Sequence, residues 1–503
     1  MDEPALGLAS RERALAELGE RRFDLLVVGG GIVGAGVAEA ATAHGLAVAL
    51  VDRGDFGGGT SSASSKLIHG GLRYLRLGDV GLVREAHHER RALTRVVAPH
   101  LVHRLPFLVP LYEGGPYRPW FVQSGILIYS TLARGRLNGL VDGDRARGMV
   151  PELRADGLRS CALYADAWTN DARLTLANVR AARSAGATVL NYAEVVALRG
   201  AEGAEVEADG RTVPVRARAV VNASGPWVDH VRRLEDPAAR RSVRLSKGAH
   251  VLVDPGEPWS GALTIPHDKV RVTFAVPWHG MLLLGTTDTL HEGEPDGVRC
   301  EEEDVEQVLR EASLALDPAL VSRDRVRAVF AGLRVLPGGD GDTASARRET
   351  VYSRGPHGML SVAGGKLTTY RRIALDVLVR LQADLGLHRL DRRPRPLPGA
   401  DGLDRVALPF DLPPPTRTHL LNLYGSLAPE VLAPAADDPS LLEPLRPDGP
   451  DLAAQAVYAR THEWAVSVDD VLRRRTTVWL RGESPEARDR VARLLGEPVE
   501  STT

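Results

Sequence analysis

The chain has 503 residues, a length typical of two to four domains. Hydrophobic residues make up 44% and charged residues 25%, a composition that excludes disordered and fibrous proteins. The 63 basic residues are balanced by 65 acidic ones. No net positive field therefore attracts the chain to nucleic acid, and we expect no nucleic-acid partner.

Lysine is unusually rare. Of the basic residues 59 are arginines, and the only lysines are Lys66, Lys247, Lys269 and Lys366. Base composition of the genome explains most of this bias. The four retained lysines still call for an explanation from the chemistry of their positions.

Two cysteines, Cys161 and Cys300, cannot build a disulfide framework, and no CxxC pair is present for zinc or redox chemistry. We therefore expect a cytoplasmic location and no metal site. Residues 1–22 alternate in charge and lack the apolar stretch of a signal peptide, so they predict an exposed helix.

A nucleotide-binding unit is predicted near the N-terminus. An apolar strand leads directly into a turn with GxGxxG spacing, and a helix and a second apolar strand follow; these elements cover residues 23–28, 29–34, 35–44 and 46–51. The same tract is long enough to suggest a membrane span. Its charged residues and dense glycines favour a buried strand, turn and helix instead.

Four residues of this unit have defined expected roles. Gly29 permits the tight turn, and Gly31 lets the backbone approach a pyrophosphate at the helix N-terminus. Gly34 allows the helix to pack closely on the strand, and Asp52 ends the second strand, where it can accept hydrogen bonds from ribose hydroxyls. Because all these features occur at the expected offsets, they predict dinucleotide binding.

A hydroxyl-rich segment follows. Residues 60–66 read TSSASSK, and residues 67–74 read LIHGGLRY. Serine-rich runs are commonly solvated loops, but a linker has no reason to continue into glycines, a cation, histidine and tyrosine. Further along, residues 121–133 form an apolar stretch that predicts either a core helix or a helix lying on a membrane surface, and both interpretations stay open.

The second half of the chain adds several patterns. Short alternating strands over 189–221 include a predicted hairpin around Asp209-Gly210. The segment GGKLTTYR at 364–371 predicts a helix that runs to about Leu385, with the positive end of its dipole toward a bound group. A proline-rich stretch after Arg393 predicts a linker, followed by helices.

The sequence resembles the FAD-dependent glycerol-3-phosphate dehydrogenases, flavoproteins that pass electrons to the respiratory quinone pool. The resemblance rests on separated blocks in the family's order: TSSASSKLIHGGLRYL from Thr60, VVNASGPWV at 220–228, LSKGAH at 245–250, LGTTD at 284–288, GLR at 332–334, GGKLTTYR at 364–371 and HEWAVSVDDVLRRRT from His462.

The resemblance implies an α/β fold with three parts. A discontinuous Rossmann-like FAD-binding domain is expected from residues 20–94, 151–240 and 351–390. An antiparallel-sheet substrate domain is expected from 95–150 and 241–350. A linker over 391–414 and a C-terminal helical domain over 415–503 complete the expectation.

The resemblance also implies the reaction. sn-Glycerol 3-phosphate is oxidised to dihydroxyacetone phosphate by hydride transfer to FAD, which we expect to be bound non-covalently, and the electrons pass to a quinone. We expect a cytoplasmic protein that is peripheral on the inner face of the cell membrane. The sequence leaves the oligomeric state open, with a homodimer among the alternatives.

Site residues follow from the matching positions. The expected substrate-binding residues are Arg73, Tyr74, Arg334, Arg348 and Thr368, where Arg347 competes with Arg348. The expected catalytic residues are His250, Arg334, Lys366 and His69, with His250 favoured over His69 as the base that accepts the hydroxyl proton. The expected cofactor-binding residues are Gly29, Gly31, Gly34, Asp52, Thr60, Ser61, Ser62, Ser65, Lys66, Ala223, Gly225, Gly365, Lys366, Leu367 and Thr368.

One block departs from the family pattern. Val335 stands directly after Arg334, where we expect proline, and the proline is delayed to Pro337. The geometry of the loop after Arg334 is therefore left open.

Three other functions compete with this one. α-Glycerophosphate oxidases resemble the same family but pass electrons to dioxygen and release hydrogen peroxide; they typically carry an insertion in the substrate half, for which this chain shows no unassigned block. Flavoproteins that oxidise amines or hydroxy acids would use arginine to bind a carboxylate. A flavin-binding sensor without activity is disfavoured because the positions of a reactive site are filled.

Overall fold

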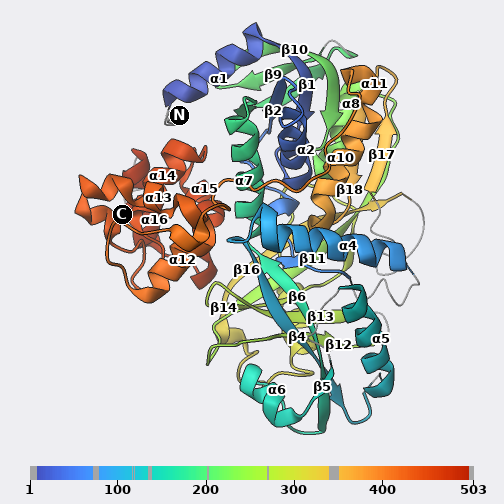
Figure 1. Ribbon diagram of the computed structural model, residues 1–503, viewed down its shortest axis with the longest axis vertical. Coiled ribbons are helices and arrows are strands. Elements are labelled where there is room, and N and C mark those ends of the chain that lie inside the picture. The colour runs from blue at the N-terminus through green and yellow to red at the C-terminus, as the bar shows by residue number, and fades with distance from the viewer. Residues whose placement is uncertain are drawn as a thin grey trace.

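The computed structural model describes residues 8–71, 79–115, 117, 119–133, 139–200, 203–268, 271–338 and 350–497. Two β-sheets and a helical unit make up this part of the chain (Figure 1). In the view of Figure 1 one sheet lies in the upper half and the other in the lower half. The helical unit, coloured orange to red, lies to the left, beside helix α7 (Asp171–Ser184).

The first sheet has eight strands: β1 (Arg22–Val28), β2 (Val48–Val51), β7 (Thr188–Leu190), β8 (Glu194–Leu198), β9 (Gly203–Ala208), β10 (Arg211–Asn222), β17 (Thr350–Arg354) and β18 (Leu360–Gly364). Strands β18, β10, β1, β2 and β7 run parallel in that order, and β17 pairs antiparallel at one edge. Both faces of β1 and β2 are buried in hydrophobic cores, which explains why these strands read as continuous apolar runs.

One face of this sheet packs against α2 (Ile32–Thr42), α7 and α10 (Tyr370–Arg380), where Val27 and Leu50 are fully buried. The predicted strand, glycine turn, helix and second strand are confirmed, with the helix starting at Ile32. The predicted hairpin is confirmed too: β9 and β10 pair antiparallel around Asp209 and Gly210, whose φ angles are 52° and 71°.

The second sheet has ten strands: β3 (Leu67–Ile68), β4 (Val102–Tyr112), β5 (Gly139–Val141), β6 (Leu158–Thr169), β11 (Val243–Val253), β12 (Ala262–Pro266), β13 (Val272–Trp278), β14 (Met281–Gly285), β15 (Thr289–His291) and β16 (Val326–Pro337). Its pairs are antiparallel except β4 with β12. The expected antiparallel sheet is therefore present, and α9 (Glu302–Ala312) packs on it.

Two of the predicted domain ranges need correction. The range 151–240 was assigned to the nucleotide-binding domain, but β6 pairs with β4 along almost its whole length and so belongs to the second sheet. Strand β3, inside the predicted range 20–94, pairs with β6 in the same sheet. Strand alternation in the sequence does not reveal the partner of β6, because that partner lies about fifty residues earlier in the chain.

The remaining helices are α1 (Leu8–Glu20), α4 (Val80–Ala92), α5 (Pro119–Leu132), α6 (Gly143–Met149), α8 (Val228–Glu235), α11 (Gln382–Leu385), α12 (Pro414–Tyr424), α13 (Ala428–Leu432), α14 (Ala453–His462), α15 (Val468–Asp470) and α16 (Pro485–Leu495). Helices α12 to α16 enclose a hydrophobic core of their own, which includes Leu423, Val431 and Val491. The expected C-terminal helical unit is therefore present.

Helix α1 corrects the expectation of an exposed helix. It buries Leu15 and Leu18 in the core behind the first sheet, and only its other side faces solvent. Helix α5 buries Ile126 and Tyr129 against the second sheet and exposes apolar side chains on its other side. Within the described ranges, no helix is both long and apolar enough to cross a membrane.

Candidate functional site

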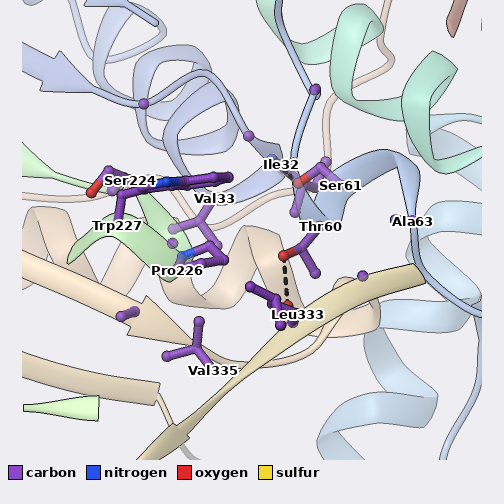
Figure 2. Close-up of a pocket in the computed structure, with 18 of the residues that line it drawn as sticks. Ile32, Val33, Thr60, Ser61, Ala63, Ser224, Pro226, Trp227, Leu333 and Val335 are labelled. Atoms are coloured by element: carbon purple, nitrogen blue, oxygen red, sulfur yellow. Dashed lines mark hydrogen bonds between the residues drawn. The ribbon is translucent and has the colours of Figure 1, made fainter. Parts of the chain in front are cut away.

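A cavity of about 580 Å³ is lined by residues of both sheets. On one side it is bounded by the segments that follow β1, β2, β10 and β18, at the carboxyl ends of the parallel strands, where open α/β sheets bind ligands. On the other side it is bounded by β11 and β16 of the second sheet. Figure 2 shows this arrangement, with Ser224, Pro226 and Trp227 facing Leu333 and Val335 across the space.

The glycine turn between β1 and α2 lines the cavity through Gly29 and Gly31. Gly29 has a φ of 105°, a conformation that L side chains rarely adopt. A Cβ on Gly34 would lie 1.8 Å from the carbonyl oxygen of Gly29, so Gly34 permits the close packing of helix and turn, as expected, without lining the cavity itself.

Asp52 lies on the cavity wall directly after β2. Its carboxylate accepts hydrogen bonds from the backbone N–H of Gly30 at 2.6 Å and of Gly54 at 2.9 Å. Burial raises the pKa of Asp52 to about 6, although both hydrogen bonds act in the opposite direction. The carboxylate is therefore fixed toward the turn and titrates close to neutral pH.

The hydroxyl-rich loop bridges the two sheets. Thr60 Oγ1 donates a hydrogen bond to the carbonyl of Leu333 in β16 at 2.7 Å (Figure 2). Ser61 Oγ accepts from the backbone N–H of Ile32 at 2.9 Å, at the start of α2. Thr60, Ser61 and Ser65 line the cavity, whereas Ser62 does not. The loop thus holds the glycine turn at a fixed distance from the second sheet.

Lys66 does not lie on the cavity wall, in contrast to the expectation that it contacts the cofactor. Its side chain is 1% exposed, and Nζ donates to both carboxylate oxygens of Asp171 at 2.8 and 3.0 Å. The ammonium also lies 5.0 Å from the ring centre of Trp278 and 4.9 Å from that of Phe330. Sequence offered no indication of this because Asp171 lies 105 residues away.

His250 lines the cavity from β11 and stacks on Phe330, with ring centres 4.8 Å apart. Its Nε2 lies 2.9 Å from Ser65 Oγ, and Nδ1 has no hydrogen-bond partner among the described residues. Burial lowers the pKa of His250 well below its ordinary value, and the positive charges of Arg334 and Lys66 lower it further. The imidazole is therefore neutral at physiological pH, and burial and the two cations make it a weaker base than a solvent-exposed histidine.

Arg334 lines the same end of the cavity from the neighbouring strand β16. It lies opposite Ser246 of β11, on the same face as His250, because side chains two and four residues apart share a face of a sheet. Its Nη1 is 3.3 Å from Asp288 Oδ2, and Nη2 donates to Thr286 Oγ1 at 2.9 Å. The guanidinium is thus held in place at the wall. Val335, where proline was expected, continues β16.

The segment after β18 adds to the side of the cavity formed by the first sheet. Gly365, Lys366, Leu367 and Thr368 all line the cavity. Thr368 Oγ1 donates to the carbonyl of His69 at 3.2 Å and lies 3.1 Å from the backbone N–H of His69, which also lines the cavity. After β10, Ala223 and Gly225 line it as well.

Three expected substrate-binding residues, Arg73, Tyr74 and Arg348, lie outside the described residues, as does Arg347. Among the described residues, no group of three or more His, Cys, Asp or Glu side chains is arranged to hold a metal ion.

Several residues at the site were missed in the sequence. Asp171 anchors Lys66, Asp288 positions Arg334, and Trp227 and Arg474 line the cavity. Trp227, Asp288 and Arg474 lie inside blocks that carry the resemblance, but nothing in those blocks singles them out. Asp171 is recognised only through its pairing with Lys66, which is distant in sequence.

Comparison with known proteins places these features in a family. Residues 24–371 match the family described as FAD dependent oxidoreductase, and residues 393–502 match the C-terminal domain of alpha-glycerophosphate oxidase. Two similar relatives are glycerol-3-phosphate dehydrogenase 2 of Mycobacterium tuberculosis, 37% identical over 98% of this chain and 87% of the relative, and glycerol-3-phosphate dehydrogenase of Synechocystis, 33% identical over 93% and 90%.

Solved structures agree with the fold. The glycerol-3-phosphate dehydrogenase from Bacillus halodurans complexed with FAD superposes with a TM-score of 0.79 and 27% identity, covering 98% of this chain and 95% of that one. The α-glycerophosphate oxidase of Mycoplasma pneumoniae, at 16% identity, a TM-score of 0.58 and coverage of 75% and 99%, shares the fold.

Proposed function

Because the chain belongs to the family of FAD-dependent oxidoreductases, we propose that it oxidises sn-glycerol 3-phosphate to dihydroxyacetone phosphate and passes the electrons to a respiratory quinone. The observation that carries the proposal is the convergence of Arg334, Lys366 and His250 on one cavity that the glycine turn between β1 and α2 also lines. The names of the relatives, glycerol-3-phosphate dehydrogenases matched over almost the whole chain, support the choice of substrate.

The residues of the cavity fit FAD. Gly29 and Gly31 bring bare backbone to the N-terminus of α2, which suits a pyrophosphate. Asp52 offers a carboxylate for ribose hydroxyls at the end of β2. The N-terminal turn after Gly365 would place the positive end of a helix dipole near the flavin, where reduction adds negative charge. When bound, FAD accepts the hydride that leaves C2 of the substrate.

The chain's own residues then have separate tasks. Arg334 presents a planar pair of donors to the phosphate or to the negative charge that develops on the substrate oxygen. His250 lines the cavity and is the proposed acceptor of the hydroxyl proton, so that loss of a hydride from C2 and of this proton from oxygen leaves a ketone. By resemblance, Arg73, Tyr74 and Arg348 complete the phosphate site.

A second candidate function is oxidation by dioxygen with release of hydrogen peroxide. The match of residues 393–502 to the C-terminal domain of alpha-glycerophosphate oxidase favours it. Steady-state turnover of glycerol 3-phosphate, measured in parallel with a soluble quinone analogue and with dioxygen, separates the two. Fast quinone reduction with negligible peroxide supports the dehydrogenase, and stoichiometric peroxide supports the oxidase.

The substrate itself is tested by initial rates with an artificial electron acceptor. Glycerol 3-phosphate should give turnover, whereas glycerol lacks the phosphate that Arg334 is proposed to bind and should be a far poorer substrate. Glycine and lactate serve as the amine and hydroxy-acid alternatives. Turnover with either one, but not with glycerol 3-phosphate, would overturn the proposed function.

We also propose that α5 contacts the surface of the membrane that contains the quinone. Trp120, Phe121, Leu127 and Ile128 of this helix are 64%, 47%, 57% and 51% exposed. Aromatic side chains favour the membrane interface. Arg134 and Arg136, which follow the helix, lie outside the described residues.

The membrane contact is tested by co-sedimentation with vesicles of phosphatidylethanolamine and phosphatidylglycerol. Trp120→Glu with Leu127→Glu should abolish binding. The control Leu314→Glu changes a leucine of similar exposure, 48%, outside α5 and should not alter binding. Equal binding of all three proteins would remove α5 from this role.

A further inference from the structure

Among its described residues, the C-terminal helical unit reaches the cavity through one turn, η11 (Val471–Arg475). Arg474 of this turn lines the cavity together with Asp52, Asp55 and Tyr192 of the nucleotide-binding part. The turn begins directly after α15. Through Arg474, the C-terminal unit, which has its own hydrophobic core, contributes a side chain to the cavity wall.

A buried ion cluster holds this turn against the segment that follows β2. Asp55 is 4% exposed and lies three residues after Asp52. It binds Arg475 through two hydrogen bonds of 2.5 and 2.7 Å and also accepts from Nε of Arg474. Although burial acts to raise the pKa of Asp55, the two arginines hold it below its ordinary value. The carboxylate is therefore charged and doubly paired.

A second segment of the cavity wall, at Tyr192, is held by the same part of the C-terminal unit. Arg474 Nη2 donates to Asp470 Oδ1 at 2.7 Å, and the hydroxyl of Tyr192 donates to the same oxygen at 2.7 Å. Both Asp55 and Tyr192 line the cavity, so two segments of its wall are bound to η11 and to the last residue of α15 before it.

Arg474 retains the capacity to bind a ligand. Its Nε and Nη2 are used by Asp55 and Asp470, and among the described residues Nη1 has no hydrogen-bond partner. The side chain is 13% exposed, so this donor belongs to a largely desolvated guanidinium in the cavity wall. Charge-assisted hydrogen bonds to phosphate or ribose oxygens are stronger in such surroundings than in water.

We propose that Arg474 binds the adenosine diphosphate half of FAD and that the C-terminal unit thereby acts as a latch on the cofactor. Arg474 pairs with Asp55, which lies in the same segment after β2 as Asp52. The carboxylate of Asp52 suits the adenosine ribose, so Arg474 is assigned to this half of FAD. Because η11 would contact FAD through Arg474 and also pairs with Asp55, FAD binding and docking of the C-terminal unit stabilise each other. The proposal depends on FAD as cofactor and is independent of substrate and electron acceptor.

The test compares two neighbouring arginines. Arg474→Ala removes the proposed ligand contact while Arg475 still pairs with Asp55. Arg473→Ala is the matched control, because Arg473 is 46% exposed, pairs with Asp469 at 3.6 Å and does not line the cavity. The full-length proteins are stripped of FAD and titrated with FAD while flavin fluorescence is followed.

The dissociation constant of FAD should rise roughly ten- to a hundredfold in Arg474→Ala, the range expected for one charge-assisted hydrogen bond. Arg473→Ala should stay within about twofold of the wild type, and Arg474→Lys should recover part of the loss. An unchanged constant in Arg474→Ala, or an equal rise in both alanine variants, would overturn the proposal.

Limited proteolysis gives a second readout on the wild-type chain. Arg405 lies before the C-terminal helices, is 88% exposed and is followed by Val406, so trypsin can cleave after it. FAD should slow cleavage at this site in the stripped wild-type protein if the cofactor stabilises docking. Cleavage at the same rate with and without FAD would contradict the latch, even if Arg474→Ala failed to fold.

Discussion

Replacing Arg334 by alanine tests the proposed substrate site most sharply. The guanidinium lies at the cavity wall on the same sheet face as His250, held by Asp288 at 3.3 Å and Thr286 at 2.9 Å. It takes no part in the glycine turn or in the contacts of Asp52. We therefore expect Arg334→Ala to lose activity while keeping its flavin.

The size of the loss follows from two contributions. Removing one donor that stabilises developing negative charge costs about 2.7–4 kcal/mol, or a factor of roughly 10²–10³ in kcat. The change also leaves the Asp288 carboxylate without its cation, and its repulsion of a phosphate dianion adds roughly 1 kcal/mol. We expect kcat/KM to fall by about 10³ or more, and the double variant Arg334→Ala/Asp288→Asn to recover several-fold.

The assay is the rate of flavin reduction under anaerobic conditions, together with the flavin content per chain. Arg327→Ala is the control, since Arg327 lies on the same strand and pairs with Asp254 at 3.5 Å without lining the cavity. If Arg334→Ala with full flavin content reduces its flavin at the wild-type rate, Arg334 has no place in the site and the reasoning fails.

Three further predictions concern the cofactor site and the core. Burial raises the pKa of Asp52 to about 6, and ribose hydroxyls bind the ionised form, so FAD affinity should rise roughly tenfold between about pH 5 and pH 7. Fluorescence titration should show no such rise in Asp52→Asn. Lys66→Met leaves the buried Asp171 carboxylate unpaired and should lower the free energy of unfolding by about 3–5 kcal/mol in denaturant titrations, with recovery when Asp171→Asn is added. Gly34→Ala would place a methyl group 1.8 Å from the oxygen of Gly29, so the purified variant should lack flavin absorbance; a fully loaded variant would contradict this geometry.

Features set by local chemistry could be predicted from the sequence. The turn of Gly29 to Gly34, the strands beside it and the position of Asp52 follow from a few neighbouring residues, as does the hairpin at Asp209. The resemblance extended this to His250, Arg334 and Lys366, which line one cavity although they come from three different strands or the segments that follow them.

Pairings between distant residues could not be predicted. Strand β6 belongs to the second sheet because of its register with β4, which no local pattern encodes. Lys66 was expected at the cofactor, yet its partner is Asp171, and a compact ammonium between two aromatic rings explains why arginine did not replace it. Lys247 pairs with Asp304 at 2.6 Å, and Lys269 lies outside the described residues.

The central claim is tested most directly by anaerobic titration of the purified, flavin-loaded protein with sn-glycerol 3-phosphate. The visible absorbance band of oxidised flavin should be lost in proportion to added substrate, and dihydroxyacetone phosphate should form in equal amount. A band that stays unchanged with excess glycerol 3-phosphate, in a protein whose flavin dithionite still reduces, would contradict the proposed function.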